Sequence, residues 1–141
     1  MKALFLALAL SLVVPVSAQN IWPEQFGAPV TVINLDHPFQ VNGYLDPAWC
    51  TEPCIPVLVD ITVTYEYQEL NPDGVLVTKQ EIKKLANFGD TTSFAKKGDG
   101  YHKIFLSFMY QCIDPNTGKP CNEGEIFEYC CPDPIPVVPD S

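Results

Sequence analysis

Cysteine is the residue type in this chain whose possible chemistry is most clearly defined. Six cysteines are present, namely Cys50, Cys54, Cys112, Cys121, Cys130 and Cys131. Thiolates bind metals such as zinc, whereas thiols in an oxidising compartment form disulfides. The leader described below predicts export, so the even count predicts a disulfide framework. A zinc site built from the cysteines at 50, 54 and 130–131 is the alternative.

The spacing of the cysteines suggests which of them pair. The adjacent cysteines at 130–131 have Cα atoms about 3.8 Å apart, which is too close for a mutual disulfide, so we expect them to bond to two different partners. Cys112 and Cys121 flank a turn-forming sequence and are expected to close a small loop. Cys50 and Cys54 then remain as partners of the 130–131 pair, and a bond between Cys50 and Cys54 is the alternative.

Oxygen-bearing side chains in the segment 114–125 have a spacing similar to that of a calcium loop. Asp114, Asn116, Asn122 and Glu125 would supply the ligands. Lys119, however, occupies the position at which such a loop needs glycine. We therefore interpret this segment as a hairpin turn, with calcium binding as the alternative.

The two histidines, His37 and His102, are the side chains best suited to acid–base chemistry near neutral pH. His37 precedes a proline and His102 begins a strand-like run, and neither lies near a recognisable nucleophile motif. Turn or surface roles are therefore favoured for both. We expect no catalytic residue, no metal site and no cofactor, and hence a protein that is not an enzyme.

Charge is distributed unevenly along the chain. The formal net charge is −9 and no arginine is present, which disfavours nucleic acid and acidic membrane surfaces as partners. Six of the eight lysines nevertheless fall between positions 79 and 103. The candidates for contact with an anionic partner are Lys83, Lys84, Lys96, Lys97 and Lys103. The alternative is that these lysines protect a sheet edge against aggregation.

The first 18 residues have the three parts of a secretory signal peptide. A lysine at position 2 precedes an apolar run over 3–14, and small residues at 16–18 form the expected cleavage site after Ala18. The run is too short for a membrane span, although a buried helix or an anchor is the alternative. We therefore expect a secreted, extracellular protein with one domain over 19–131, a proline-rich tail over 132–141 and no transmembrane segment.

The elements that position these side chains are predicted to be strands. The stretch 57–67 alternates between two faces, and its apolar face comprises Val57, Val59, Ile61, Val63, Tyr65 and Tyr67. The turn sequence over 71–74 predicts a hairpin with a second strand over 75–85, against a helix over 78–86 as the alternative. Further strands are expected over 29–35, 39–45, 92–95 and 125–131.

The segment 101–112 is a second strong strand, and it is apolar on both faces. Such a strand is either central in a sandwich or lines a cavity. Phe105 and Met109 share one face and are the candidates for an apolar pocket between sheets. Many short strands with frequent turns and little helix predict an all-β, disulfide-linked antiparallel sandwich.

Short motifs resemble those of the nematode transthyretin-like secreted proteins. The residues are 41–45 (Val-Asn-Gly-Tyr-Leu), Cys50 with Pro53, the strand start at 57–61, the run from Lys103 to Cys112, and 118–121 (Gly-Lys-Pro-Cys). The resemblance implies a secreted protein and a sandwich of the transthyretin-like form, with the immunoglobulin-like form as the alternative. A competing resemblance, to lipid-recognition domains related to the Niemann-Pick C2 protein, rests on the leader, six cysteines and the loop before the long strand.

These patterns together predict a non-enzymatic binding module. Its expected partner is an extracellular protein or a cell-surface component, met through loops or through the lysine-bearing hairpin. The alternative is an extracellular carrier of a lipid or another apolar ligand, held in a pocket between the sheets.

Overall fold

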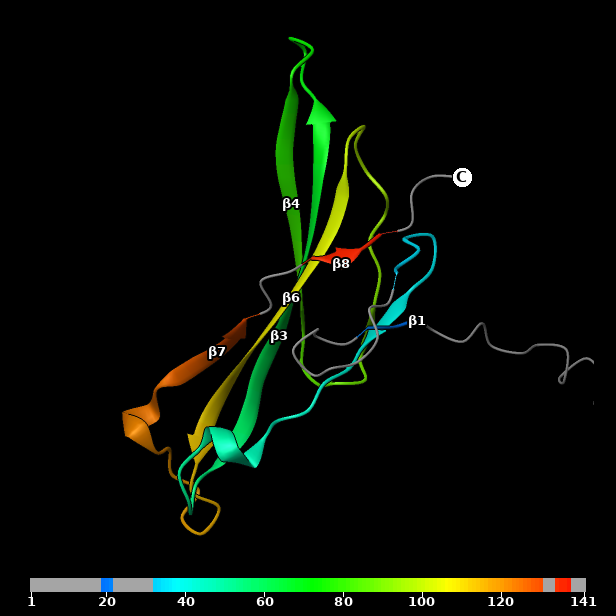
Figure 1. The fold of residues 1–141 in the computed structure, drawn as a ribbon. Helices are drawn as coiled ribbons and strands as arrows, with labels where there is room; N and C mark the ends of the chain where they lie inside the picture. The colour runs from blue at the N-terminus through cyan, green and yellow to red at the C-terminus, as the bar shows by residue number, and fades with distance from the viewer. Residues whose placement is uncertain (1–18, 22–31, 131–133, 138–141) are drawn as a thin grey trace, which may run out of the picture.

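The computed structural model describes residues 19–21, 32–130 and 134–137 (Figure 1). In these residues the chain forms two sheets packed together as a β-sandwich, as the sequence predicts. The expected signal peptide at 1–18, most of the tail and Cys131 lie outside the described residues. Of the strand expected over 29–35, the described part contributes an isolated bridge between Ile33 and Val137.

The larger sheet has the strand order β4-β3-β6-β7, with β8 paired to β6, and all its pairings are antiparallel. Its strands are β3 (Ile55–Leu70), β4 (Leu76–Leu85), β6 (His102–Ile113), β7 (Ile126–Cys130) and β8 (Ile135–Pro136). The smaller sheet has the order β1-β2-β5, from β1 (Gln19–Ile21), β2 (Phe39–Val41) and β5 (Thr91–Thr92). Two short 3-10 turns, η2 (Pro47–Trp49) and η3 (Asn122–Gly124), lie in connecting loops.

The strand prediction for the segment 75–85 is confirmed, and the helical alternative is wrong. β4 pairs with β3 over its whole length, from Leu70 opposite Leu76 to Ile61 opposite Leu85. The turn is held by Asn71, whose side-chain oxygen accepts the backbone N–H of Val75 at 2.9 Å. Cross-strand pairing along ten residues outweighs the modest helix propensity of Lys, Gln and Glu.

A β-bulge in β3 changes which of its residues face the core. The register with β6 shifts between Leu58 and Asp60, so Val59 is an extra residue. Beyond the bulge the odd-numbered residues are buried as predicted, from Ile61 onward. Before it the odd-numbered residues are exposed, and Val57 retains 43% of its accessible surface. The single apolar face predicted for 57–67 is therefore two faces on opposite sides of the sheet.

The core lies between the sheets and is rich in aromatic rings. Tyr65 of β3 packs against Phe94, which in turn stacks on Phe39 of the smaller sheet. Nearer β7, Trp49 stacks on Tyr129 at 4.8 Å between ring centroids. Burial of each large apolar side chain stabilises the fold by about 1.5–3 kcal/mol, so this cluster fixes how the two sheets stack.

The disulfide pairing differs from the prediction. Cys50 bonds to Cys112 and Cys54 to Cys121, with Cα–Cα distances of 5.8 and 6.6 Å. The predicted Cys112–Cys121 loop closure, the predicted links from Cys50 and Cys54 to the 130–131 pair, and the Cys50–Cys54 alternative are therefore wrong. The zinc alternative is excluded for the two early cysteines. The reason is the strand register: Ile55 lies opposite Ile113, so the loop before β3 is carried to the end of β6.

Candidate binding surfaces

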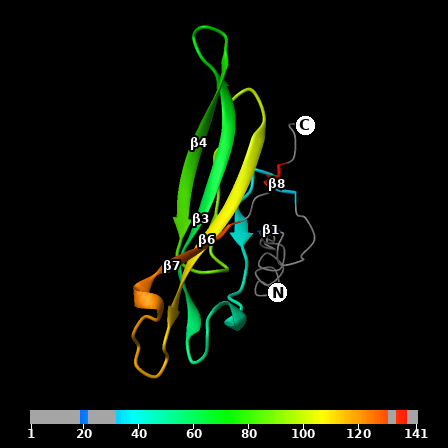
Figure 2. The same cartoon turned by 60° about the vertical axis from the view of Figure 1, so that its left-hand side comes forward.

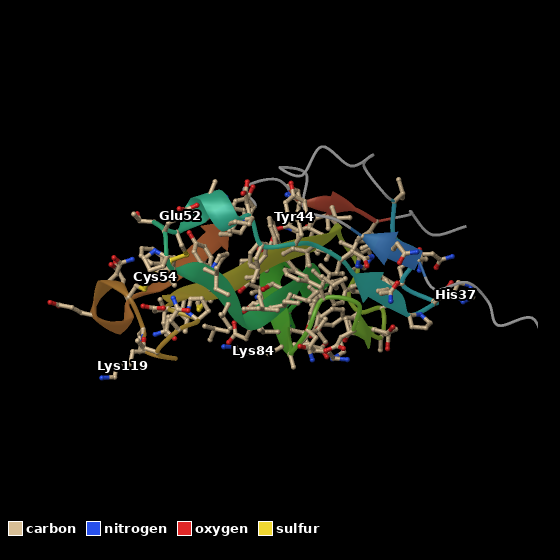
Figure 3. All side chains as sticks on the ribbon, turned by 90° about the horizontal axis from the view of Figure 1, so that it is seen from below. His37, Tyr44, Glu52, Cys54, Lys84 and Lys119 are labelled. Carbon is tan, nitrogen blue, oxygen red and sulfur yellow. A yellow bond between two sulfur atoms is a disulfide. The ribbon has the colours of Figure 1, made fainter. Side chains whose placement is uncertain are left out.

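The lysines predicted to contact a partner lie on both faces of the larger sheet. Lys83 is opposite the core residue Val63, and its ammonium group donates to the Ser93 carbonyl and lies 4.9 Å from the Phe94 ring centroid. Lys84 is the next residue along and therefore points to the outer face (Figure 3). Lys84 pairs there with Asp60 at 3.3 Å.

The remaining candidate lysines are also engaged within the molecule. Lys97 forms an ion pair with Glu81 at 3.1 Å, and this carboxylate raises the pKa of the Lys97 ammonium group. Lys103 lies on the outer face, 4.5 Å from the Tyr101 ring centroid. Lys96 contributes positive charge close to His102. The five lysines therefore do not gather into one basic surface, because Lys84 and Lys103 lie on the outer face whereas Lys83 lies on the face toward the core.

A polar cluster beside the core fixes the loop before β6. The Tyr65 hydroxyl lies 2.7 Å from His102 Nδ1 and accepts the backbone N–H of Lys97 at 3.0 Å. Gly98 follows with a φ of +87°, and a Cβ atom there would lie 2.1 Å from the Gln68 carbonyl oxygen. Only glycine allows this close approach, so the loop is clamped directly onto β3.

The chemistry of this cluster is structural. Burial lowers the pKa of His102, and the charge of Lys96 lowers it further, so the imidazole is neutral near pH 7. Burial also raises the pKa of Tyr65, which keeps the hydroxyl protonated. The sequence patterns alone did not predict this contact. The signal for it was that a tyrosine and a histidine occupy inward positions on two strong strands.

The second histidine lies elsewhere. Figure 3 shows His37 far from Glu52 and Cys54, which lie together at the disulfide-linked end. The possible calcium segment forms a turn in which the Asp114 carboxylate accepts the backbone N–H of Asn116 at 2.9 Å. Across the described ranges, no three His, Cys, Asp or Glu side chains gather as a metal site.

Phe105 and Met109 lie on the outer face of the larger sheet. They alternate with the buried residues Leu106 and Phe108 of β6, and Phe105 is opposite Thr64. The two residues are half-buried there and do not line the space between the sheets. A pocket built on them would therefore open to the outside of the sandwich.

An apolar surface lies on this outer face at the disulfide-linked end, and we call it the disulfide-end patch. Its members are Ile55, Val57 and Val59 of β3 and Ile126 of β7, which are 44%, 43%, 42% and 53% exposed. Register places Val57 and Ile126 in one row across the sheet, on either side of Gln111 of β6, because Val57 is opposite Gln111 and Gln111 is opposite Ile126. Met109 is the next outward residue of β6 and extends the patch toward the centre of the sheet.

The surroundings of the disulfide-end patch are stiff and acidic. An open depression of about 700 Å³ adjoins it, lined by Pro47, Ala48, Cys50, Glu52, Pro53, Cys54 and Ile55. Both disulfides fasten this loop to the end of β6 and the turn that follows. Glu52 and Glu128 are exposed at opposite sides, and Glu128 is opposite Met109 in the ladder. The patch is therefore a fixed apolar surface with a negatively charged rim.

Comparison with known proteins adds no functional information. No family model, curated protein or solved structure matches this chain. In the part of the chain that the structure describes, no helix is long and apolar enough to cross a membrane.

Proposed function

We propose that this protein is a secreted, non-enzymatic binding module that recognises an extracellular protein or a cell-surface component through the disulfide-end patch. The observation that carries the proposal is the exposure of four large aliphatic side chains, Ile55, Val57, Val59 and Ile126, on one face of a doubly cross-linked end. Several large apolar side chains exposed on one face of a secreted domain are typical of a protein interface.

The sequence supports a role for this exposure beyond folding. A regular β3 would turn the odd-numbered residues of its first half toward the core, as it does from Ile61 onward. The bulge at Val59 instead keeps Val57 and Ile55 outside while the rest of the strand stays buried. Bulges commonly redirect side chains at functional positions. Each Å² of apolar surface that stays exposed forgoes about 25 cal/mol of hydrophobic stabilisation. A partner that covers this surface recovers that free energy.

The rim indicates the chemistry of the partner. Glu52 and Glu128 flank the apolar centre, and the nearest candidate lysine, Lys84, is paired with Asp60. A matching surface would have an apolar centre surrounded by lysine or arginine side chains. The excess of acids over lysines in the chain also opposes binding to nucleic acid.

The carrier alternative has less support. Phe105 and Met109 lie on the outer face, and aromatic rings from both layers occupy the space between the sheets. Native mass spectrometry of the exported protein, compared with its denatured mass, tests this alternative. A lipid-sized adduct present only in the native spectrum would favour the carrier and contradict the proposal.

The binding proposal is tested by paired charge substitutions. Labelled protein is titrated onto intact cells of its own source, and saturable binding is expected. Val57→Lys with Ile126→Lys is expected to weaken that binding at least about tenfold, because burying unpaired charges costs more than about 1.4 kcal/mol.

The control is Val32→Lys with Leu70→Lys, which adds the same charges at exposed positions outside both the disulfide-end patch and β4. This variant should bind as the wild type does. Absence of saturable binding, or equal loss in both variants, would contradict a contact through the disulfide-end patch.

A further inference from the structure

The strand β4 is a long, open edge of the larger sheet. Figures 1 and 2 show the β3–β4 hairpin rising beyond β6 and past the smaller sheet, with β4 on its outer side. In the described residues β4 pairs with β3 alone, and it stands at the end of the strand order. An edge of ten residues presents unpaired N–H and C=O groups that another strand can bind.

The hairpin determines which amides point outward. Asn71 donates its backbone N–H to the Val75 carbonyl at 2.9 Å, which makes residues 71 and 75 a hydrogen-bonded pair. Hydrogen-bonded pairs alternate along an antiparallel ladder, so Val77, Lys79 and Glu81 bond to β3 in turn. The even-numbered residues of β4 therefore direct their N–H and C=O groups to the open edge.

The charges of β4 are complementary to a second copy of the same strand. In an antiparallel pair with a two-fold axis at Gln80, Lys79 of each copy lies opposite Glu81 of the other. Both residues point to the same face, because two positions separate them. Each already has an ion partner in its own chain, Glu69 for Lys79 and Lys97 for Glu81. The dimer would join these pairs into alternating rows of positive and negative charge.

Neighbouring registers are disfavoured by the same charges. A two-fold axis at Lys79 would place the two copies of Lys79 directly opposite each other, and an axis at Glu81 would place the two copies of Glu81 opposite each other. Like charges in such positions repel. The axis at Gln80 also gives the longest overlap. It brings the exposed residue Val75 opposite Leu85, and Leu76 and Val77 opposite the aliphatic stems of two lysines.

From this complementarity we propose that the protein forms a symmetric dimer by antiparallel β4–β4 pairing about Gln80, which joins two larger sheets into one continuous sheet. The occupant of the edge is a second copy of this chain. The contact uses a different part of the molecule from the disulfide-end patch, so each can fail without the other.

The test is a charge-swap series measured by sedimentation velocity over a range of protein concentrations. Wild-type protein is expected to show a monomer–dimer equilibrium. Lys79→Glu and Glu81→Lys should each weaken it about tenfold or more, since each turns two attractive cross-strand pairs into repulsive ones. The double variant Lys79→Glu with Glu81→Lys restores opposite charges across the axis and should recover most of the dimer.

Two further variants distinguish loss of β4–β4 pairing from loss of the fold and from a change in net charge. Gln80→Pro removes an N–H directed at the open edge, not at β3, and should abolish the dimer while circular dichroism and both disulfides remain. Lys119→Glu makes the same change in net charge as Lys79→Glu, but in the loop beyond β6, and should leave the dimer unchanged. A monomer at every concentration overturns the proposal, and so does a dimer that survives Gln80→Pro or that the charge swap does not rescue.

Discussion

The two ends of the larger sheet share β3 and β6 but are held in different ways. At the lower end in Figure 1, two disulfides fasten the loop before β3 to the end of β6 and the turn after it. At the other end the β3–β4 hairpin extends past the core, and its tip is held by its own ladder and turn. The same kind of strand pairing is thus stabilised by cross-links at one end and by local contacts at the other.

The comparison shows that exposure has different consequences at the two ends. Apolar residues are exposed at both, for example Val57 at the disulfide-linked end and Val75 at the hairpin tip. A fixed surface loses little conformational entropy when a partner binds it. A hairpin tip with few tertiary contacts opens more readily and suits pairing through its backbone. We therefore propose partner recognition at the first end and self-association at the edge of the second.

The largest effect is expected from removing one of the two disulfides at the disulfide-linked end. Replacing Cys50 and Cys112 together by serine should lower the free energy of unfolding by about 4 kcal/mol on the chain-entropy model, because a loop of 62 residues is no longer closed. Urea unfolding followed by tryptophan fluorescence measures this, since Trp49 lies beside Cys50.

Hydrogen exchange in the same variant sharpens the comparison. Protection should fall around the loop before β3, while amides of β4 should change only in proportion to global stability. Equal additional loss at both ends would show that the two ends are one cooperative unit.

A smaller effect is expected at the clamp that lies between the two ends. Tyr65→Phe removes the hydroxyl that accepts the Lys97 N–H and contacts His102 Nδ1, and should cost about 1–3 kcal/mol. Tyr67→Phe is the matched control, because it removes a hydroxyl from a neighbouring ring 5.1 Å away without touching the Lys97 contacts. Urea unfolding of both variants measures the difference, and equal stability would argue against the clamp.

The pH dependence of stability should report the same clamp. The pKa of His102 is lower in the folded protein than in the unfolded chain, mainly because of burial. The unfolded state therefore binds more protons as pH falls below the ordinary histidine value, and stability declines in that range. The thermal midpoint should fall between about pH 7 and pH 5, and His102→Gln should make this decline shallower. An unchanged slope in the variant would mean that other groups cause it.

The smallest effect is expected at the hairpin tip. Leu70 is half exposed and lies opposite Leu76, so Leu70→Ser should change the free energy of unfolding by no more than about 0.5 kcal/mol. Val63→Ser in the same strand is the contrasting variant, because Val63 is fully buried, and it should cost more than about 2 kcal/mol. Urea unfolding at low protein concentration measures both free-energy changes. Similar losses of stability in the two variants would contradict the distinction between the core and the hairpin tip.

Local patterns were sufficient for the fold class and for most strands. The alternation over 57–67 and the turn sequence at 71–74 predict the β3–β4 hairpin, since side-chain periodicity and turn propensity depend on neighbouring residues alone. The strand expected over 101–112 is likewise confirmed, and its pairing with β3 and β7 supports the central position, which was one of the two alternatives. These predictions needed no knowledge of which strands pair.

What depends on distant residues was not predictable in the same way. Alternation alone assigned Val57 to the buried face, because a bulge at Val59 is visible only once β6 fixes the register. The disulfide partners of Cys112 and Cys121 depend on that register too, since pairing requires short distances between segments more than 60 residues apart. The grouping of the lysines failed for a related reason, because the pairing of β4 and β6 with β3 decides that Lys83 faces the core while Lys84 and Lys103 face outward.

The amino-acid sequence by itself therefore determined the strand-rich character, the main hairpin and the set of residues with possible chemistry, all of which depend on local preference. Tertiary structure decided which apolar residues stay outside, which cysteines meet and which strand is left at the edge of the larger sheet. Those outcomes follow from the pairing and register of strands far apart in the chain, and the free energy that selects them comes from burying both sheets against one common core.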